Sequence, residues 1–297
     1  MASLREIRRK IKSVRSTEQI TKAMKMIAAA RMRRAQASIL ASRPFAAKME
    51  ELVHSLAALE RAALEGKAEV DHPFFRPPAW DRPGGAGEFL ILVAADKGLC
   101  GGFNANAQRS AIEWIRRRQE RPVILAVVGR KARDFASRLS GASVACELAG
   151  IFPKVSFAHA ELLGEAAISA YLQGRAASVT AIYNEFRSVM SQRVVERELL
   201  PIAVKTEAAR AMDFQFEPER RRVLSALLPR YLKAQLYRIL LESQAAELAA
   251  RMNAMDSASR NAGELIDSLT LTLNRTRQGL ITREIAELVG GAEALAS

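Results

Sequence analysis

The 297-residue chain has few of the residues from which catalytic and redox sites are commonly built. It contains only two cysteines, Cys100 and Cys146, which lie too far apart in sequence for a CxxC motif or a disulfide framework. No apolar run approaches the roughly 20 residues that span a bilayer. The N-terminal segment MASLREIRRK also lacks the apolar region of a secretory signal. These absences predict a soluble protein in a reducing compartment.

Histidine is equally scarce, and no catalytic motif is complete. His54, His72 and His159 are dispersed and form no HExxH pattern. The string GASVA at 141–145 only partly resembles the GxSxG motif of hydrolases. Glu284 and Glu287 form a carboxylate pair that a solvated helix face explains. We therefore expect no catalytic residue, no metal site and no cofactor, while an enzyme remains an open alternative.

The charge is strongly positive and unevenly distributed. The formal net charge is +13, and residues 1–43 hold twelve lysines and arginines against the two acids Glu6 and Glu18. Such a segment suits an acidic partner, whether nucleic acid, anionic lipid or an acidic protein loop. A solvated helix face is the plainer explanation. A basic coiled-coil protein that binds nucleic acid is therefore an alternative function.

A long helix is predicted at each end of the chain. In the first, over about residues 3–62, Pro44 predicts a kink near Ser42 and Arg43. Its apolar residues recur at steps of three to six: Ile7, Ile11, Val14, Ile20, Met24 and Ile27. The second helical segment begins at residue 217. Its residues at alternating steps of four and three favour a left-handed coiled coil: Leu241, Ala245, Leu248, Met252, Met255, Ser259, Ala262, Ile266, Leu269, Leu273, Thr276 and Leu280.

Between the helices, short apolar runs alternate with helical segments. The runs EFLILVA, PVILAVVG and ASVACEL are typical of a parallel sheet covered by helices on both faces. SVTAIYNEF and VVERELLPI predict two adjacent strands at a sheet edge. The segment 66–87 is rich in proline and glycine, which indicates a linker.

The predicted fold is therefore an α/β domain combined with a long antiparallel coiled coil. Four segments are expected: an N-terminal coiled-coil helix at 1–65, the linker at 66–87, a Rossmann-like α/β domain at 88–205 and a C-terminal coiled-coil helix at 217–297. The two helices should pack together around the inserted domain. Because the C-terminal helix is the longer, we expect its last turns to project beyond the pair.

The glycine-rich segment AADKGLCGGFN at 94–104 follows the first predicted strand. Its glycine spacing matches neither GxxxxGK[ST] nor GxGxxG, which weakens a phosphate site. Cys100 has Lys97 nearby but no histidine close in sequence, which weakens a reactive thiol. A structural corner between a strand and a helix is the favoured interpretation.

The last turns of the chain carry two distinct stripes. Ile281, Ile285 and Leu288 form an apolar stripe, while Gln278 and Thr282 share another face of the helix. Gly290 and Gly291 are expected to end the helix. The segment is either a coiled-coil terminus or a tip that fits a socket in a partner.

Three separated motifs in this sequence resemble the gamma subunits of F-type ATP synthases. They are IRRKIKSVRSTEQITKAMKMIAAARMRRAQ at 7–36, DKGLCGGFN at 96–104 and ITREIAELVGGAEAL at 281–295. The resemblance implies a non-catalytic rotor subunit of the central stalk, which couples ion flow through a membrane c ring to conformational change at the catalytic sites. It implies partners in the alpha and beta subunits of the ring, the epsilon subunit and the c ring. No specific nucleic acid and no membrane insertion are expected, and the implied location is the cytoplasmic face of the bacterial inner membrane.

The same resemblance implies the residues that contact the ring of catalytic subunits. Lys22, Met24 and Lys25 match positions near an acidic lever segment. The positions that match contacts with loops of the ring are Arg251, Gln278, Thr282 and Glu284. Ile281, Ile285 and Leu288 would run in an apolar bearing.

Overall fold

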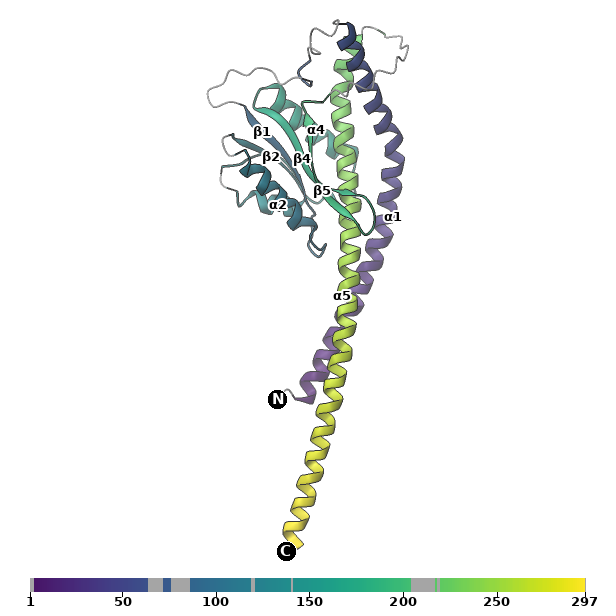
Figure 1. The fold of residues 1–297 in the computed structure, drawn as a ribbon, viewed down its shortest axis with the longest axis vertical. Helices are drawn as coiled ribbons and strands as arrows, with labels where there is room; N and C mark the ends of the chain where they lie inside the picture. The colour runs from purple at the N-terminus through teal and green to yellow at the C-terminus, as the bar shows by residue number, and fades with distance from the viewer. Residues whose placement is uncertain are drawn as a thin grey trace. The chain divides into compact units, whose positions relative to one another are not determined.

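The computed structural model describes residues 3–63, 72–75, 86–118, 121–139, 141–203, 217 and 220–296. Most of the predicted linker 66–87 lies outside these residues. The chain forms two compact units: the smaller combines 1–28 with 252–297, and the larger comprises 29–251. Helices α1 (Leu4–Ala63) and α5 (Arg220–Ala296) each contribute to both units (Figure 1). Across the described ranges, we find no helix with the length and hydrophobicity that a bilayer span requires.

A five-stranded sheet in the order β3-β2-β1-β4-β5 forms the centre of the larger unit. Neighbouring strands among the first four pair in parallel, and the last pairs antiparallel with β4. This confirms the predicted parallel sheet and the predicted pair of adjacent strands at its edge. The strands are β1 (Gly87–Val93), β2 (Val123–Val128), β3 (Ser143–Leu148), β4 (Ala176–Phe186) and β5 (Gln192–Leu200).

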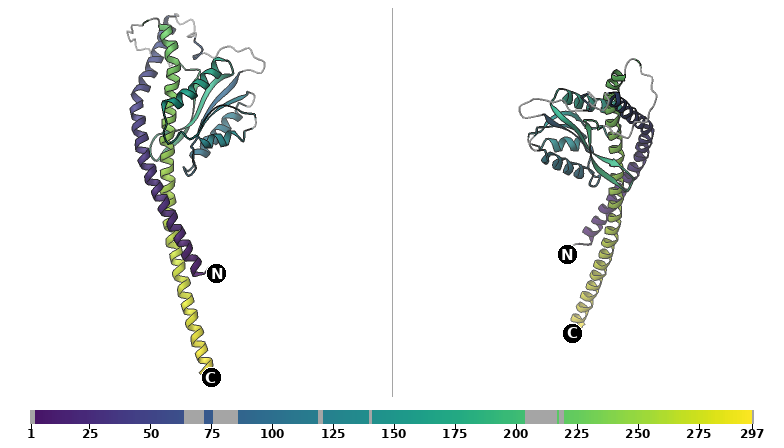
Figure 2. Two further views of the ribbon diagram at one scale, coloured as in Figure 1. Left: turned by 180° about the vertical axis from the view of Figure 1, so that it is seen from behind. Right: turned by 45° about the horizontal axis from the view of Figure 1, so that its top comes forward.

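Helices cover both faces of this sheet, as predicted (Figures 1 and 2). On one face, Leu90 and Leu92 of β1 pack with residues of α2 (Phe103–Arg116) and α3 (Arg130–Ala136). On the other face, Phe89 and Ile91 pack with α4 (Phe157–Leu172) and α5. All seven residues of β1 are buried, which explains its unbroken apolar sequence.

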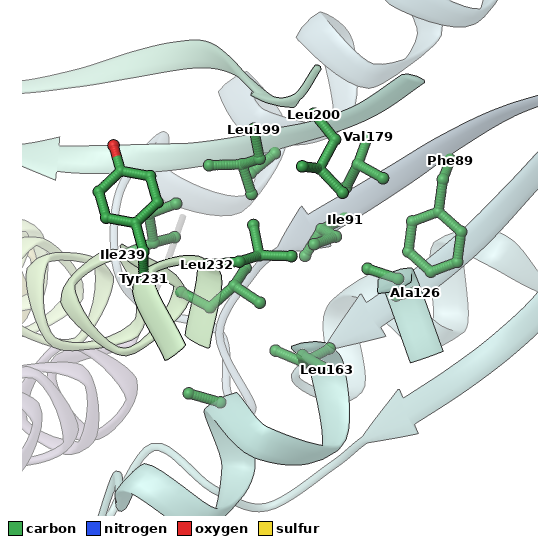
Figure 3. Packing of buried hydrophobic residues seen from close by; sticks show 14 of the residues in the cluster. Phe89, Ile91, Ala126, Leu163, Val179, Leu199, Leu200, Tyr231, Leu232 and Ile239 are labelled. Carbon is green, nitrogen blue, oxygen red and sulfur yellow. The ribbon is translucent and has the colours of Figure 1, made fainter. Parts of the chain in front are cut away.

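Helix α5 supplies a large part of this second core. Leu232 and Ile239 from α5 lie with Leu163 of α4 and with Ile91 and Leu200 of the sheet (Figure 3). All five side chains are less than a tenth exposed. The strands of the α/β domain therefore depend on the C-terminal helix for cover on this face.

A short described piece of the predicted linker also enters the core. Phe74 is buried, and its ring meets that of Tyr171 edge to face with centroids 6.4 Å apart. The Tyr171 hydroxyl donates a hydrogen bond to the Pro73 carbonyl at 2.9 Å, and the Ile202 amide donates to the Phe74 carbonyl. The sequence assigned no role to this stretch. Its aromatic residue closes one side of the sheet.

In the smaller unit, α1 and α5 lie side by side (Figures 1 and 2). The heptad pattern predicted for α5 is confirmed as far as Thr276: Met255, Ala262 and Ile266 are buried, and the other heptad positions from Met252 to Thr276 are half-buried. Leu280 is exposed. The packed length of the pair therefore ends near Thr276, and α5 continues past it.

The apolar residues whose recurrence predicts α1 are not all shielded beyond Val14. Ile20 and Ile27 are 57% and 55% exposed. The shielded positions instead continue from Ile7 at strict steps of four and three through the sequence Ile11, Val14, Glu18, Thr21, Lys25 and Ala28. A regular coiled-coil seam requires this spacing whatever the side chains are, so polar residues occupy it here.

Neither proline nor glycine ends the two long helices where it occurs inside them. Pro44 lies inside α1, which continues through it to Ala63. Helix α5 continues through Gly290 and Gly291 to Ala296, so the predicted end at these glycines is wrong. Glycine costs a helix about 1 kcal/mol relative to alanine but does not force the chain out of it.

Two glycines with similar backbones allow a test of the sheet packing. Gly129 follows β2 with φ +87°, and a Cβ there would lie 2.1 Å from the Ala94 carbonyl oxygen. Gly141 has φ +83° but open space around its Cβ position. Gly129→Ala should lower the free energy of unfolding by about 3 kcal/mol or more, because the backbone strain at a positive φ and the steric overlap of the new Cβ add. Gly141→Ala should cost only about 1–2 kcal/mol.

The measurement is urea unfolding of the full chain, followed by circular dichroism. Equal losses in the two variants would contradict the close approach of the β2–α3 turn to the end of β1.

Candidate interaction surfaces

The loop between β1 and α2 is held by its own polar side chains. Asn104 accepts a hydrogen bond from the Ala95 amide at 2.8 Å. The Asp96 carboxylate accepts from the amides of Arg130, Gly150 and Phe152 at 3.1, 2.7 and 3.1 Å. Three amides at this edge of the sheet are therefore already paired with a carboxylate of the chain itself. This supports the structural-corner interpretation.

Cys100 lies in the same loop and is buried. The Asn104 side-chain amide lies 3.2 Å from its sulfur. Burial raises the pKa of the Cys100 thiol, with a further rise from Glu247. Because the thiolate is the reactive form, a raised pKa makes this cysteine a poor nucleophile. Its role here is to pack the loop against α5 beside Phe103 and Ala246.

Arg251, one of the predicted contact residues, joins this loop to α5. Its guanidinium donates to the Gly98 carbonyl at 2.7 Å and to the Glu247 carboxylate at 2.9 Å. Only 14% of the Arg251 side chain and 8% of the Glu247 side chain are exposed. Burial raises the pKa of Glu247, and Arg251 opposes that rise. The bond to Gly98 joins residues 153 positions apart, so only the i, i+4 spacing of Glu247 and Arg251 was visible in the sequence.

The predicted N-terminal contact residues lie together on α1 in the smaller unit. Lys22 is exposed, while Met24 and Lys25 are half-buried. Lys25 binds Asp256 of α5 with an N–O distance of 2.5 Å, and this hydrogen bond lowers the pKa of Asp256. Lys25 therefore has a partner within the helix pair, whereas Lys22 presents its ammonium group to the surface.

Beside Lys22, an apolar stripe points away from the seam. Ile20, Met24 and Ile27 follow one another at i, i+4 and i+7, and the two isoleucines are more than half exposed. We call these three residues the outer stripe of α1. An exposed apolar stripe of this kind marks an interaction surface.

The remaining predicted contact residues lie on the last turns of α5, beyond the end of the seam. All of them are exposed: Gln278, Ile281, Thr282, Glu284, Ile285 and Leu288. The apolar residues are prominent, with Leu288 74% exposed and Ile285 56% exposed. Thr282 donates to the Gln278 carbonyl at 3.0 Å, so these two polar residues share a face as predicted. We call residues 278–291 the tip of α5.

The described residues contain no cluster of histidine, cysteine, aspartate or glutamate that could hold a metal ion. What they offer is an internally satisfied loop and two exposed surfaces, the outer stripe of α1 and the tip of α5. These features suit binding to other proteins.

Comparison with known proteins extends this picture. A family model described as ATP synthase matches residues 3–295. The chain is 42% identical to the ATP synthase gamma chain of Elusimicrobium minutum, with 99% of each chain covered. It is 44% identical to the ATP synthase gamma chain of Anaeromyxobacter sp. (strain K), with 99% of this chain and 100% of the relative covered.

Solved structures show the same fold. A chain of the central stalk and c ring of the Tetrahymena thermophila mitochondrial ATP synthase is 28% identical, with a TM-score of 0.59; 81% of this chain and 99% of that chain are covered. A chain of the Euglena gracilis mitochondrial ATP synthase is 17% identical, with a TM-score of 0.65; the coverage is 98% and 94%. The second likeness is one of fold alone.

The Arg251–Glu247 pair generates a prediction about pH. A carboxyl group whose pKa is raised on folding contributes stability below its unfolded value, near 4.5, and loses it as the pH rises through the folded value. Arg251→Met removes the group that opposes this rise, so the variant should lose stability relative to wild type as the pH increases. At pH 8 the loss should reach about 3–5 kcal/mol.

Urea unfolding between pH 5 and pH 8 measures this difference. The matched control is the double variant Glu247→Gln, Arg251→Met, whose difference from Glu247→Gln alone should not depend on pH in this range. A single-variant difference that stays constant from pH 5 to pH 8 would contradict a buried carboxylate paired with Arg251.

Proposed function

The chain belongs to the family of ATP synthase gamma chains, and on that premise we propose that it is the central-stalk rotor subunit of an F-type ATP synthase. Identity above 40% over nearly the whole of both relatives carries this assignment. Its partners are then the alpha and beta subunits of the F1 ring, the epsilon subunit and the membrane c ring. It acts as a peripheral protein at the cytoplasmic face of the bacterial inner membrane.

Its work in the complex is coupling rather than catalysis. Rotation of the c ring turns the helix pair, and the orientation of the pair changes the relative free energies of the open and closed catalytic states. A contact with the same free energy in every catalytic state would not change the populations of those states. The surface of the helix pair therefore has to be asymmetric. The smaller unit has this property, because the outer stripe and Lys22 lie on α1 alone.

The N-terminal surface is the proposed contact with the acidic lever segment of the catalytic subunits. Lys22 supplies an exposed positive charge, and Met24 belongs to the adjacent apolar stripe. Lys25 is already bound to Asp256, so an acidic partner would share or replace that ion pair. Arg251 contacts the ring only through the small part of its side chain that Glu247 and Gly98 leave exposed.

The tip of α5 is the proposed bearing. Ile281, Ile285 and Leu288 would turn against an apolar sleeve, which offers no directional bonds and therefore resists rotation little. Gln278, Thr282 and Glu284 can form hydrogen bonds with loops of the ring, and such bonds depend on orientation. The combination allows both smooth rotation and preferred angles.

Reconstitution tests the proposal directly. The chain is mixed with alpha and beta subunits of a closely related bacterial enzyme, and assembly and ATP hydrolysis are measured. We expect a stable complex whose hydrolysis rate differs from that of the ring subunits alone. A chain that neither assembles nor changes the rate would refute the rotor function.

Helix continuity in the smaller unit should be essential for coupling. Ile266 lies on the seam of α5 and is 9% exposed. Ile266→Pro removes a backbone hydrogen bond and introduces a clash, which together cost about 3 kcal/mol or more. Proton-driven ATP synthesis by the assembled enzyme should therefore fall several-fold.

Ile266→Ala, which shortens the same side chain but preserves the helix, is the control and should retain most of the coupling. Unchanged synthesis in the proline variant would count against torque transmission through a stiff helix pair.

A further inference from the structure

Beside the core of the larger unit lies a partly open cavity of about 210 Å³. Glu50 of α1, the end of β5 with Arg197 and Glu198, and Tyr231 and Gln235 of α5 contribute to its lining. A single buried water needs only roughly 10–15 Å³ of such space. The cavity therefore has room for a small organic group. It is separate from the outer stripe of α1 and from the tip of α5.

Gln235 is the residue that indicates a ligand. It is 1% exposed, and neither its amide oxygen nor its amide nitrogen has a hydrogen-bond partner among the described residues. An amide left unpaired inside a protein costs about 1–3 kcal/mol. Buried polar groups nearly always have a partner, so one is expected in the adjacent cavity. That partner has to offer both a donor for the oxygen and an acceptor for the nitrogen.

The charges around the cavity indicate which kind of ligand group donates to the Gln235 oxygen. Two carboxylates, Glu50 and Glu198, line the cavity with the guanidinium of Arg197. The His54 ring lies 3.9 Å from Glu50, so Glu198 is the carboxylate that a ligand meets first. Glu198 is exposed at the cavity and forms no ion pair within the described ranges. A positively charged N–H group satisfies this excess of negative charge and donates to the Gln235 oxygen at the same time.

The remaining walls suit the stem that carries such a group. Leu199 and Leu232 line the cavity, and Figure 3 shows them with Tyr231 at the edge of the apolar cluster. Apolar walls of this kind cover the methylene chain of an amine or a guanidine while its charged head meets the carboxylates. The Tyr231 ring offers a further aromatic surface that is favourable for a cation.

We propose that this cavity is a binding site for an organic cation, a guanidinium or alkylammonium group on a short apolar stem with a nearby carbonyl oxygen. The cation binds Glu198 and Glu50 and donates to the Gln235 oxygen, while the Gln235 nitrogen donates to the carbonyl. An arginine or lysine side chain of a partner protein has this chemistry, and so does a small free amine or guanidine.

Three amino acids with capped termini test the proposal. N-acetyl-arginine amide carries the cation, N-acetyl-lysine amide carries an ammonium group, and N-acetyl-citrulline amide is the neutral isostere of the first. Binding to the full chain is measured by calorimetry and by the shift of the Gln235 side-chain amide signals in NMR. We expect saturable binding of the two cations and at least about tenfold weaker binding of the citrulline compound.

Two variants identify the site. Glu198→Gln should weaken binding of the arginine probe about tenfold, and Gln235→Leu should abolish the binding. The matched control is Glu113→Gln, which removes one carboxylate from the exposed surface of α2 and should leave the affinity unchanged. Because Glu198 is exposed, its variant should fold even where that of Gln235 does not.

Equal binding of the arginine and citrulline compounds, no saturable binding, or equal affinities of Glu198→Gln and Glu113→Gln would each overturn the proposal.

The source of the cation is distinguished in the assembled complex. If the probes bind the free chain but no longer bind after assembly, a side chain of a partner subunit occupies the cavity. If they bind the complex as well, the natural ligand is a free solute. Binding to the free chain does not depend on the proposed rotor function, whereas the comparison in the complex requires that the chain assembles.

Discussion

The rest of the structure depends on the double use of helix α5. Within the larger unit it is buried almost all round between Tyr231 and Ala249, because the sheet covers it as well as α1. From about residue 259 onward the shielding narrows to one stripe, and that stripe follows the coiled-coil repeat. One continuous helix is thus a core element of an α/β domain and half of a two-helix rod. Both α5 and α1 run without interruption through the two units, so their backbone hydrogen bonds connect one part to the other.

Polar groups on α5 make this arrangement specific. Glu242 and Glu247 are both buried, and each is bound to an arginine four residues along the helix, Arg238 and Arg251. Paired ions of this kind add little net stability, since removing charge from water is costly. They instead specify how the loop and the helix are positioned, because Arg251 reaches the Gly98 carbonyl in only one register of loop and helix. The apolar core holds the sheet to α5, and these bonds define where it is held.

The sequence predicted the parts of the fold that follow from regular spacing. The buried strands and the repeat of α5 could be recognised because their apolar residues recur at the period of the element. The stripe of α1 could not, because Glu18, Thr21 and Lys25 occupy its seam while Ile20 and Ile27 face outward. Hydrophobicity alone does not distinguish a residue that is buried within its own chain from one that is exposed and contacts another protein. The cover provided by Phe74 and the link from Arg251 to Gly98 were hidden because both join residues far apart in sequence. The exposure of Gln278, Ile281 and Leu288 was predictable from helix length, whereas their roles rest on the family resemblance.

The part of α5 that extends past Thr276 has a thermodynamic consequence. Nothing in the seam shields it, so its order rests on helix propensity and on pairs such as Arg283 with Glu287. A single exposed helix is marginally stable in water even when its first turns are already formed. In the free chain these turns should fray, and their amides should exchange rapidly with solvent. Binding in a socket would order these turns. Part of the binding free energy at the tip would therefore offset the loss of conformational entropy in the helix. Substitutions that change only helix propensity would then change the affinity for the socket.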